Sequence, residues 1–384
     1  MSKPLISHGA GVRAFSSDGS DFIDCSSGTF NLSLGYSHPE VMKIIRDQSQ
    51  KLIHCSTRLR NTTVEALEAK LAELSPIPGA KVYLKIGGGS EANEGAIKMA
   101  QYVTGRTDIV TFWRSHLGQT IYMMGLSGNA FRQSPFQFPS VNSVKVPPPY
   151  CRRCFYGGIR PSCGFLCGSK VEDFVKFSSN GRIAAVLLEP IFGNGDNIVC
   201  PPEFANEVRR VARQNGAALI YDEIQTGIGR TGTMFATQWL GGDPDLLTIA
   251  KGLGGSGAQI AAIIGKPEYM DMPINHHAFT YGGNILACAV ALRTLEIIGA
   301  PQFLSDVRAI GDYLRTGLED LARRYEFCDE IRGVGLMLGL EIVDRSGEPS
   351  ADLTNYISEK AFEHGLIIRT SRYGHGNVLK FRPR

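Results

Sequence analysis

Residues 217–227 read Ala-Ala-Leu-Ile-Tyr-Asp-Glu-Ile-Gln-Thr-Gly. The first five form an unbroken apolar run, which ends at the acidic residue Asp222. The run Ala217–Tyr221 predicts a strand that is buried on both faces, as strands of parallel sheets are. Ile183–Leu188 has the same character, and Glu203–Gln214 between them carries apolar residues at helical spacing. A strand, a helix and a second strand in this order predict a βαβ unit with a right-handed crossover.

The same alternation of strands and helices extends along the chain on both sides of this unit. It predicts an α/β fold whose large domain contains a mostly parallel sheet, followed by a smaller α+β domain. We expect the N-terminal segment at 1–45, the large domain at 46–295 and the C-terminal small domain at 296–384. The segment 1–45 is expected to pack with the small domain or with a partner subunit. The further expected strands are Val12–Phe15, Asp21–Asp24, Lys81–Lys85, Asp108–Phe112, Leu246–Ile249, Ile260–Ile264, Gly333–Val343 and Gly365–Arg369, and the further helices are Glu91–Gln101, Cys288–Ile298, Pro301–Tyr325 and Ala351–His364.

Composition excludes several classes of function. The 384 residues include 40 Lys plus Arg and 37 Asp plus Glu, a net charge of +3, which gives no electrostatic footprint for nucleic acid or an anionic membrane. No apolar run approaches the roughly 20 residues that a membrane span needs, and the N-terminus lacks the apolar stretch of a secretory signal. Nine cysteines without a signal indicate reduced thiols, so we expect a cytoplasmic protein.

A glycine run enters a predicted helix at residues 87–94, Gly-Gly-Gly-Ser-Glu-Ala-Asn-Glu. Free backbone N–H groups at a helix start, together with the Ser90 hydroxyl, can cradle a phosphate. An ordinary strand-to-helix turn would have the same composition. Taken alone, the run therefore does not establish a phosphate site.

Asp222 and Gln225 follow the buried strand, at the carboxyl edge where open α/β sheets bind ligands. A carboxylate there can pair with a protonated pyridine nitrogen and keep the ring an electron sink. Gln225 can reach a ring oxygen, and Ile224 can pack on a ring face. The alternative is that Asp222 caps the start of a helix.

Lys251 closes the apolar strand Leu246–Ile249 and precedes Gly252 and the pair Gly254-Gly255. Burial lowers the pKa of a lysine, and a neutral amine is what imine formation requires. Further along, Thr280 lies in Phe-Thr-Tyr-Gly-Gly-Asn and could offer a hydroxyl to a phosphate, or could belong to a plain turn before the next helix.

Together these four motifs resemble those of the class III (ornithine/4-aminobutyrate type) aminotransferases. These are fold type I enzymes that depend on pyridoxal 5′-phosphate (PLP). The similarity runs from about Gly11 to Arg382, and agreement at many stations is stronger than any one motif. The resemblance implies a large domain whose mostly parallel sheet is sandwiched by helices. The matching elements are Gly19–Cys25, Gly35–Val41, Gly88–Glu94, Leu188–Gly193, Asp222–Gly232, Pro244-Asp245, Lys251 and Thr280–Asn284.

The resemblance implies a role for each station. Lys251 forms the Schiff base with PLP and moves the proton between substrate and cofactor. Asp222 holds the pyridinium and Gln225 the phenolic oxygen. The remaining implied contacts are Gly89 and Ser90 on the phosphate, Thr280 on the phosphate of the other subunit in a homodimer, and Glu189 on the substrate side.

Departures from the family pattern bear on the substrate. His116-Leu117-Gly118-Gln119-Thr120 stands where relatives have an aromatic residue followed by His-Gly-Arg-Thr. His116 then covers the ring face, and Gln119 replaces an arginine that often grips a substrate carboxylate, which puts a second carboxylate in doubt. Gly88 replaces a hydroxyl residue of the phosphate loop. The chain stops at Arg384, where relatives usually continue.

Four cysteines, Cys151, Cys154, Cys163 and Cys167, cluster in one segment. Four thiolates could bind tetrahedral zinc. We favour free thiols in a packed loop and expect no metal.

The sequence thus predicts a PLP-dependent aminotransferase that moves an amino group between a small amine or amino acid and a 2-oxo acid. The alternative on the same fold is a racemase, decarboxylase or lyase, because fold alone does not fix the reaction. A catalytically weakened dimer subunit is a third reading, which the intact Lys251 and Asp222 oppose.

Overall fold

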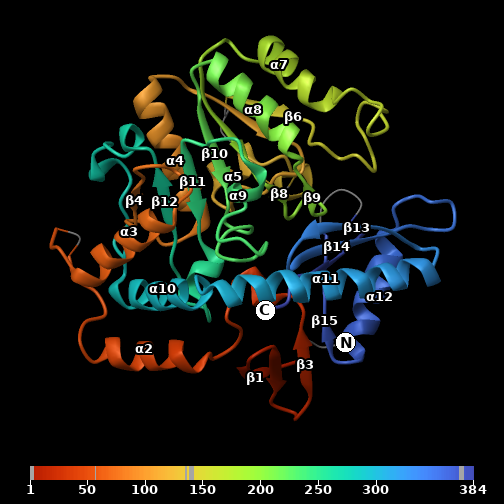
Figure 1. Cartoon of the computed structure of the whole chain (residues 1–384), viewed down its shortest axis with the longest axis horizontal. Coiled ribbons are helices and arrows are strands. Elements are labelled where there is room, and N and C mark those ends of the chain that lie inside the picture. Colours follow the sequence, from red (N-terminus) through yellow and green to blue (C-terminus); the bar gives the residue numbers. More distant parts are fainter. Residues whose placement is uncertain (1–3, 57, 135, 138–141, 372–375) are drawn as a thin grey trace.

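The computed structural model describes residues 4–56, 58–134, 136–137, 142–371 and 376–384. Figure 1 shows a large sheet with helices on both faces, and a smaller unit below and to its right that contains α11, α12 and the C-terminal strands. The α/β class expected from the sequence is confirmed by this arrangement of sheet and helices.

The central sheet has seven strands in the order β4-β12-β11-β10-β7-β5-β6. Strand β12 is antiparallel to both of its neighbours, while β11, β10, β7, β5 and β6 run parallel to one another. The strand after Lys251 therefore returns against the general direction. The bounds are β4 Lys81–Tyr83, β5 Asp108–Phe112, β6 Ser143–Val146, β7 Ile183–Leu188, β10 Ala218–Asp222, β11 Leu246–Ile249 and β12 Ala262–Gly265.

Alternate residues of β10 point to opposite faces of this sheet, as the period of a strand requires. Leu219 and Tyr221 pack into a core shared with helix α8, Pro202–Gln214, whereas Ala218 and Ile220 pack into a core shared with α4, Gly89–Thr104. Both faces of the sheet are buried, which explains why the strands are continuous apolar runs in the sequence. The other helices of the large unit are α2 Pro39–Ser49, α3 Thr62–Leu74, α5 Ile121–Leu126, α6 Ala130–Gln133, α7 Leu166–Ser178, α9 Thr237–Leu240 and α10 Ile285–Ile298.

The C-terminal part forms a second sheet in the order β13-β14-β17-β16, packed against α11, Pro301–Arg324, and α12, Ala351–Glu363. The expected single strand Gly333–Val343 was wrong: it is the turn and second strand of a hairpin. The chain reverses at Gly335, whose φ of 56° suits glycine, and the apolar run continues through the turn, which hid it. The strands of this sheet are β13 Cys328–Val334, β14 Met337–Ile342, β16 Arg369–Thr370 and β17 Val378–Phe381. The fifth strand of the C-terminal part, β15 Leu366–Ile367, belongs to another sheet.

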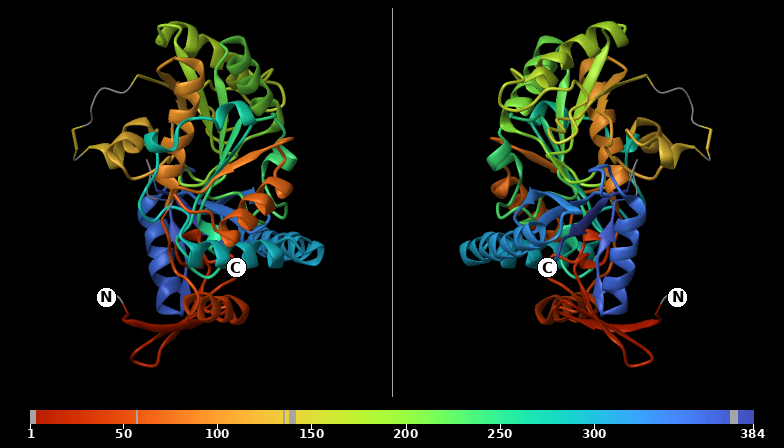
Figure 2. Two further views of the ribbon diagram at one scale, coloured as in Figure 1. Left: turned by 90° about the vertical axis from the view of Figure 1, so that its left-hand side faces the viewer. Right: turned by 90° about the vertical axis from the view of Figure 1, so that its right-hand side faces the viewer.

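The N-terminal strands form a third sheet, β1-β2-β3-β15, in which β3 pairs in parallel with β15 from the C-terminal part. Figure 2 shows these strands at the lower end of the molecule, beside α12. The N-terminal segment and the C-terminal part of the chain are therefore joined in one sheet. The remaining elements are β1 Ile6–Ala10, β2 Arg13–Ser16, β3 Asp21–Asp24, α1 Ser27–Phe30, β8 Ile191–Phe192 and β9 Ile198–Val199, together with the short 3₁₀ turns Lys251–Gly254, Pro267–Tyr269 and Ile274–His276.

Among the described residues, no single helix combines the length and apolar character needed to cross a bilayer. Only α10 and α11 taken together meet that criterion, and they are bent by 72° at their junction.

Candidate active site

A cavity of about 320 Å³ opens where α4 begins and where the chain leaves β10 and β11. This volume lies at the lower end of the range typical of small-molecule sites. The cavity is lined by Asn31, Gly87, Gly88, Gly89, Ser90, His116, Leu117, Gly118, Gln119, Ile224, Ala250, Lys251, Gly257, Ala258, Gln259 and Ile260.

One end of the cavity is built from the start of α4. Gly88 is the N-cap residue, and a Cβ placed there would meet no atom within 4 Å, so the space outside the helix start is open. A Cβ on Gly89 would come 3.0 Å from Ile224, so glycine keeps the helix close to the loop after β10. The Ser90 hydroxyl accepts a hydrogen bond from the Gln119 backbone at 3.0 Å, and its own proton remains to be donated. This end fits a phosphate.

Asp222 ends β10 and is held firmly, with 5% of its surface exposed. Its carboxylate accepts hydrogen bonds from Asn93 Nδ2 at 2.7 Å and from the Ile224 backbone at 3.0 Å. Thr248 on β11 in turn donates to Asn93 Oδ1 at 2.7 Å. Burial raises the pKa of Asp222, which a cationic ligand group would offset.

Sequence reasoning gave no role to Asn93 or Thr248. Asn93 lies within the quoted glycine-run motif, and Thr248 is the one polar residue of an otherwise apolar strand, which was the available signal.

Lys251 follows β11 directly and stands on the cavity wall with a backbone φ of 39°. Positive φ is uncommon for a side chain other than glycine, Asn or Asp and concentrates at functional sites. Burial lowers the pKa of Lys251 to about 8, while Asp222 and Glu189 act in the opposite direction. A substantial fraction of neutral amine near neutral pH is what a nucleophilic lysine needs.

We expect this pKa to be measurable in the protein without cofactor. Labelling of Lys251 by an amine-directed reagent, followed by peptide mapping, should rise with pH and reach half its maximum rate near pH 8, because only the neutral amine reacts. An ordinary lysine titrates near 10.4. A midpoint above pH 10 would contradict the buried-amine assignment.

Glu189 follows β7 and is buried at 3% exposure behind the cavity wall. Its carboxylate accepts from the His116 backbone at 2.6 Å and from the Gly193 backbone at 3.1 Å. Burial, and secondarily Asp222, raises the pKa of Glu189. The structure therefore places Glu189 under the segment that presents His116, which itself lines the cavity.

Gln225 is buried beside Ile224, and its side chain meets an arginine that sequence reasoning did not assign. Arg382 Nη1 donates to Gln225 Oε1 at 2.5 Å, and Nη2 donates to the Gly193 carbonyl at 2.5 Å. A Cβ on Gly193 would collide with Gln225 Oε1, so this glycine is required by the packing. No local sequence pattern predicts this contact, because Arg382 lies 157 residues after Gln225 in the chain.

Thr280 is exposed in the turn before α10 and is not among the residues that line the cavity of its own chain. Its neighbours Phe279 and Tyr281 are also exposed, Tyr281 to 72%. The rings of His54 and Tyr281 are tilted by 54° with centroids 5.5 Å apart, so an adjoining segment lies beside this turn. The structure thus separates Thr280 from the other predicted site residues.

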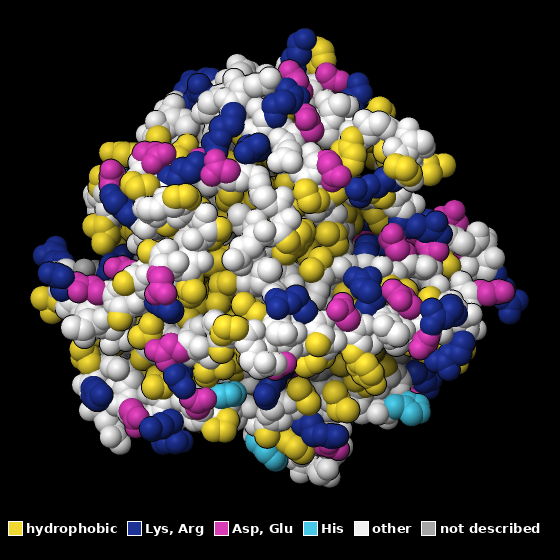
Figure 3. Space-filling model, viewed as in Figure 1, with side chains coloured by type: hydrophobic (Ala, Val, Ile, Leu, Met, Phe, Trp, Pro, Cys, Tyr) yellow, Lys and Arg dark blue, Asp and Glu magenta, His cyan; other side chains and the backbone are white. Residues whose placement is uncertain are grey.

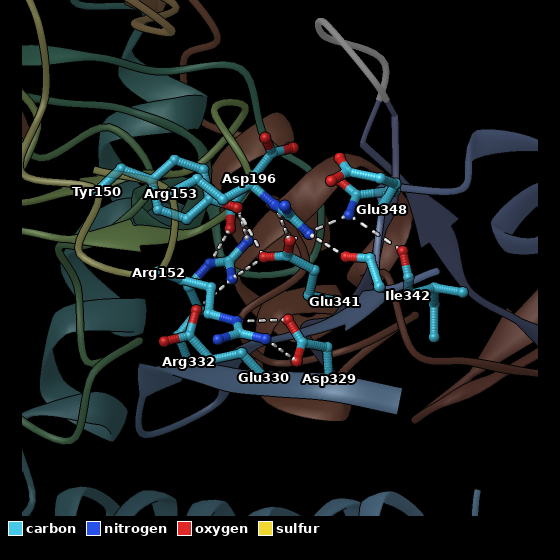
Figure 4. A network of polar contacts seen from close by, with 12 residues as sticks. Tyr150, Arg152, Arg153, Asp196, Asp329, Glu330, Arg332, Glu341, Ile342 and Glu348 are labelled. Atoms are coloured by element: carbon cyan, nitrogen blue, oxygen red, sulfur yellow. Dashed lines mark hydrogen bonds and ion pairs between the residues drawn. The ribbon is translucent and has the colours of Figure 1, made fainter. Parts of the chain in front are cut away.

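A buried polar network braces the hairpin behind the site (Figure 4). Tyr150 donates to Glu341 at 2.6 Å, Arg332 also pairs with Glu341, and the Arg332 Nε donates to the Asp196 carbonyl at 2.7 Å. Although burial alone would raise it, the pKa of Glu341 falls to about 2 because Arg332 and the Tyr150 hydroxyl stabilise the carboxylate. Asp196 lies between β8 and β9, next to Asn197, which accepts a hydrogen bond from Arg382. The network therefore holds the β8–β9 turn, whose Asn197 side chain binds Arg382.

The nine cysteines are free thiols. Within the described part of the chain, no three His, Cys, Asp or Glu side chains are arranged to hold a metal ion, and Cys151, Cys154, Cys163 and Cys167 are all within that part.

Comparison with known proteins places this geometry in context. The family model described as aminotransferase class III matches residues 2–384. The leucine/methionine racemase of Thermococcus litoralis is 34% identical over 373 residues, covering 94% of this chain and 82% of that protein. The acetylornithine aminotransferase of Methanothermobacter thermautotrophicus is 33% identical over 380 residues, covering 99% and 88%. An amine transaminase from an uncultivated Pseudomonas species, solved in the PLP-bound form, superposes with a TM-score of 0.90 at 26% identity and covers 100% of this chain and 90% of its own.

Proposed function

Because the chain belongs to the class III aminotransferase family, we propose that Lys251 is the residue that bonds the cofactor and moves the proton during amino transfer. The enzyme is a PLP-dependent aminotransferase that acts on an amino donor and a 2-oxo acid. The observation that carries the assignment of Lys251 is its position on the wall of the cavity, directly after β11.

Bound PLP supplies an electron sink for the carbon that loses its proton. In our proposal the chain holds it at five points. The start of α4 with Gly89 and Ser90 takes the phosphate, and Asp222 faces the ring nitrogen. Gln225 faces the ring oxygen, and His116 covers one ring face while Ile224 packs against the other.

Lys251 has two tasks in this proposal. Its depressed pKa leaves the amine free to attack a carbonyl carbon at neutral pH. The Lys251 amine would also serve, from its place on the cavity wall, as a base that removes and returns a proton at the substrate. We propose that Glu189 acts indirectly on the substrate side, by holding the backbone at His116 and Gly193.

Gln119 lies on the cavity wall and carries no charge, so we propose that the preferred substrates lack a second carboxylate. Gln119→Arg should then improve kcat/KM for 2-oxo acids with a second carboxylate by about tenfold, because a bidentate charged pair replaces a neutral contact. Pyruvate, which has one carboxylate, is the matched comparison. Equal effects on both acceptors would count against a carboxylate subsite at this position.

We propose a homodimer in which Thr280 completes the cofactor site of the other subunit. The turn that carries Thr280 is surrounded by exposed apolar side chains, namely Leu52, Ile53, Leu59, Phe279 and Tyr281. Exposed apolar clusters mark interaction surfaces. Figure 3 likewise shows hydrophobic side chains gathered toward the middle of one face and charged ones mainly toward its rim.

Thr280→Ala is expected to weaken PLP binding by about tenfold or less, the scale of one lost hydrogen bond, without dissociating the dimer. Equilibrium dialysis and light scattering measure the two quantities. A 41.8 kDa monomer that binds PLP with wild-type affinity would refute both the dimer and the role of Thr280.

The division of the chain into 1–45, 46–295 and 296–384 is retained as a proposal. The seven-stranded sheet of the large unit and the sheet β13-β14-β17-β16 support it, and the pairing of β3 with β15 supports the packing of 1–45 with the small domain. A cytoplasmic location is likewise proposed, since free cysteines suit a reducing compartment.

The test of the function is an amino-donor screen with the purified holoenzyme, without added acceptor. A transaminase should convert its PLP to the amine form, seen as loss of the visible band. Racemisation is the second candidate, because the relative from Thermococcus litoralis is a racemase. Inversion of an amino acid without consumption of PLP would favour that candidate.

A further inference from the structure

Arg382 is the largest fully buried side chain in the described part of the molecule, at 1% exposure. Its backbone N–H donates to the Cys25 carbonyl at 2.7 Å, and its own carbonyl accepts from the Ser27 hydroxyl at 2.6 Å. The residue after β17 is thus fixed to the N-terminal segment. Its side chain turns inward from there.

The guanidinium has no carboxylate partner within ion-pair distance among the described residues. It bonds three neutral oxygens, on Gln225, Gly193 and Asn197, and lies 3.9 Å from the centroid of the Phe30 ring. Its Nε has no hydrogen-bond partner in the part of the chain that the structure describes. Burying a charge without a counter-ion lowers the stability of the fold, so the arrangement points to a functional role for Arg382.

The bond to Gln225 has a directional consequence. Arginine has five donors and no acceptor, so it can only face the oxygen of an amide and never its nitrogen. With Oε1 held by Arg382, Gln225 Nε2 is turned away and keeps both of its protons. No described residue accepts a hydrogen bond from Nε2. The amide is therefore oriented as a donor, and it adjoins Ile224, which lines the cavity.

We infer that Arg382 is a positioning residue that fixes the Gln225 amide so that its NH₂ group donates to the ring oxygen of the cofactor. The inference rests on the proposed function, because it takes the ring oxygen to lie at Gln225. It assigns a task to the buried charge: a neutral or hydrogen-bond-accepting neighbour would leave the amide free to flip and to present its oxygen instead. The C-terminal Phe-Arg-Pro-Arg sequence then reaches the active site through Gln225.

The test is a double-mutant cycle on Arg382→Met and Gln225→Ala, read by the dissociation constant of PLP and by the absorbance maximum of the bound cofactor. Each single variant should weaken PLP binding about fivefold to tenfold and shift the maximum in the same direction. The double variant should be no weaker than Gln225→Ala alone, because Arg382 acts through Gln225. Additive effects, or a maximum that moves only in Gln225→Ala, would overturn the inference.

Arg230→Met is the matched control. Arg230 is also buried and donates to the Leu336 and Pro383 carbonyls, without contact to Gln225. It should lower thermal stability and leave the absorbance maximum unchanged. If Arg382→Met fails to fold, Arg382→Lys enters the same cycle, and the additivity criterion is unchanged.

Failure of the proposed function gives a different result. If wild-type PLP, fixed by borohydride, is not attached to Lys251, the function is wrong. If it is attached there and the cycle is additive, only the role of Arg382 is wrong.

Discussion

Lys251→Ala is expected to abolish turnover, with a loss on the order of 10⁶-fold, the scale seen when a covalent nucleophile is removed. In our proposal two tasks are lost together, because the same amine bonds the cofactor and moves the proton. The variant should also lose the visible band of the lysine-bound cofactor. Steady-state rates and absorbance spectra of the purified variant measure both effects.

Lys145→Ala is the control for removing a buried lysine. Lys145 on β6 is also partly buried, burial lowers its pKa as well, and its Nζ donates to the Gly125 carbonyl at 3.0 Å. It lines no part of the cavity, so its loss should leave turnover near the wild-type value. Borohydride reduction of wild type should place the cofactor on Lys251, and a label on any other lysine would sink the assignment.

The sheet was predictable because its strands are buried on both faces. Ile183–Leu188 and Ala218–Asp222 each carry one long apolar run, and the observed bounds differ from the expected ones by a residue or less. Functional side chains could then be placed at the ends of the strands, since parallel strands bring their carboxyl ends to one edge. Asp222 and Lys251 were predicted as cofactor residues in this way, and the structure places them at the carboxyl ends of the adjacent strands β10 and β11.

Two features could not be predicted from the sequence, because they depend on contacts between segments. The hairpin at Gly335 reads as one strand, since nothing polar interrupts the apolar run at the turn. Arg382 reads as a surface residue near a chain end, and its burial follows only from the pairing of β17 with β14 and from its bond to the Cys25 carbonyl. Local pattern carries no information about such long-range pairs.

Asp222→Asn is expected to lower the rate by about 10²–10³-fold while PLP still attaches to Lys251. The cost reflects the loss of a fixed charge aimed at the reacting group. Asn has nearly the same shape, so it can still accept from the Ile224 backbone as Asp222 does at 3.0 Å. What it lacks is the negative charge that keeps the ring nitrogen protonated and the ring an electron sink. A primary isotope effect on the α-proton should increase as proton removal becomes rate-limiting.

Asp245→Asn provides the control for a buried carboxylate on the same sheet. Asp245 is 2% exposed and accepts from Arg213 at 2.6 Å and from Lys266 at 3.0 Å, at the start of β11 and far from its carboxyl end. Its replacement should reduce the free energy of unfolding and leave the rate per folded molecule unchanged. If Asp222→Asn instead behaves like Asp245→Asn, losing stability but keeping its rate, then Asp222 is only a structural carboxylate held by Asn93. An unchanged isotope effect in Asp222→Asn would lead to the same conclusion, because the charge would then play no part in the proton-removal step.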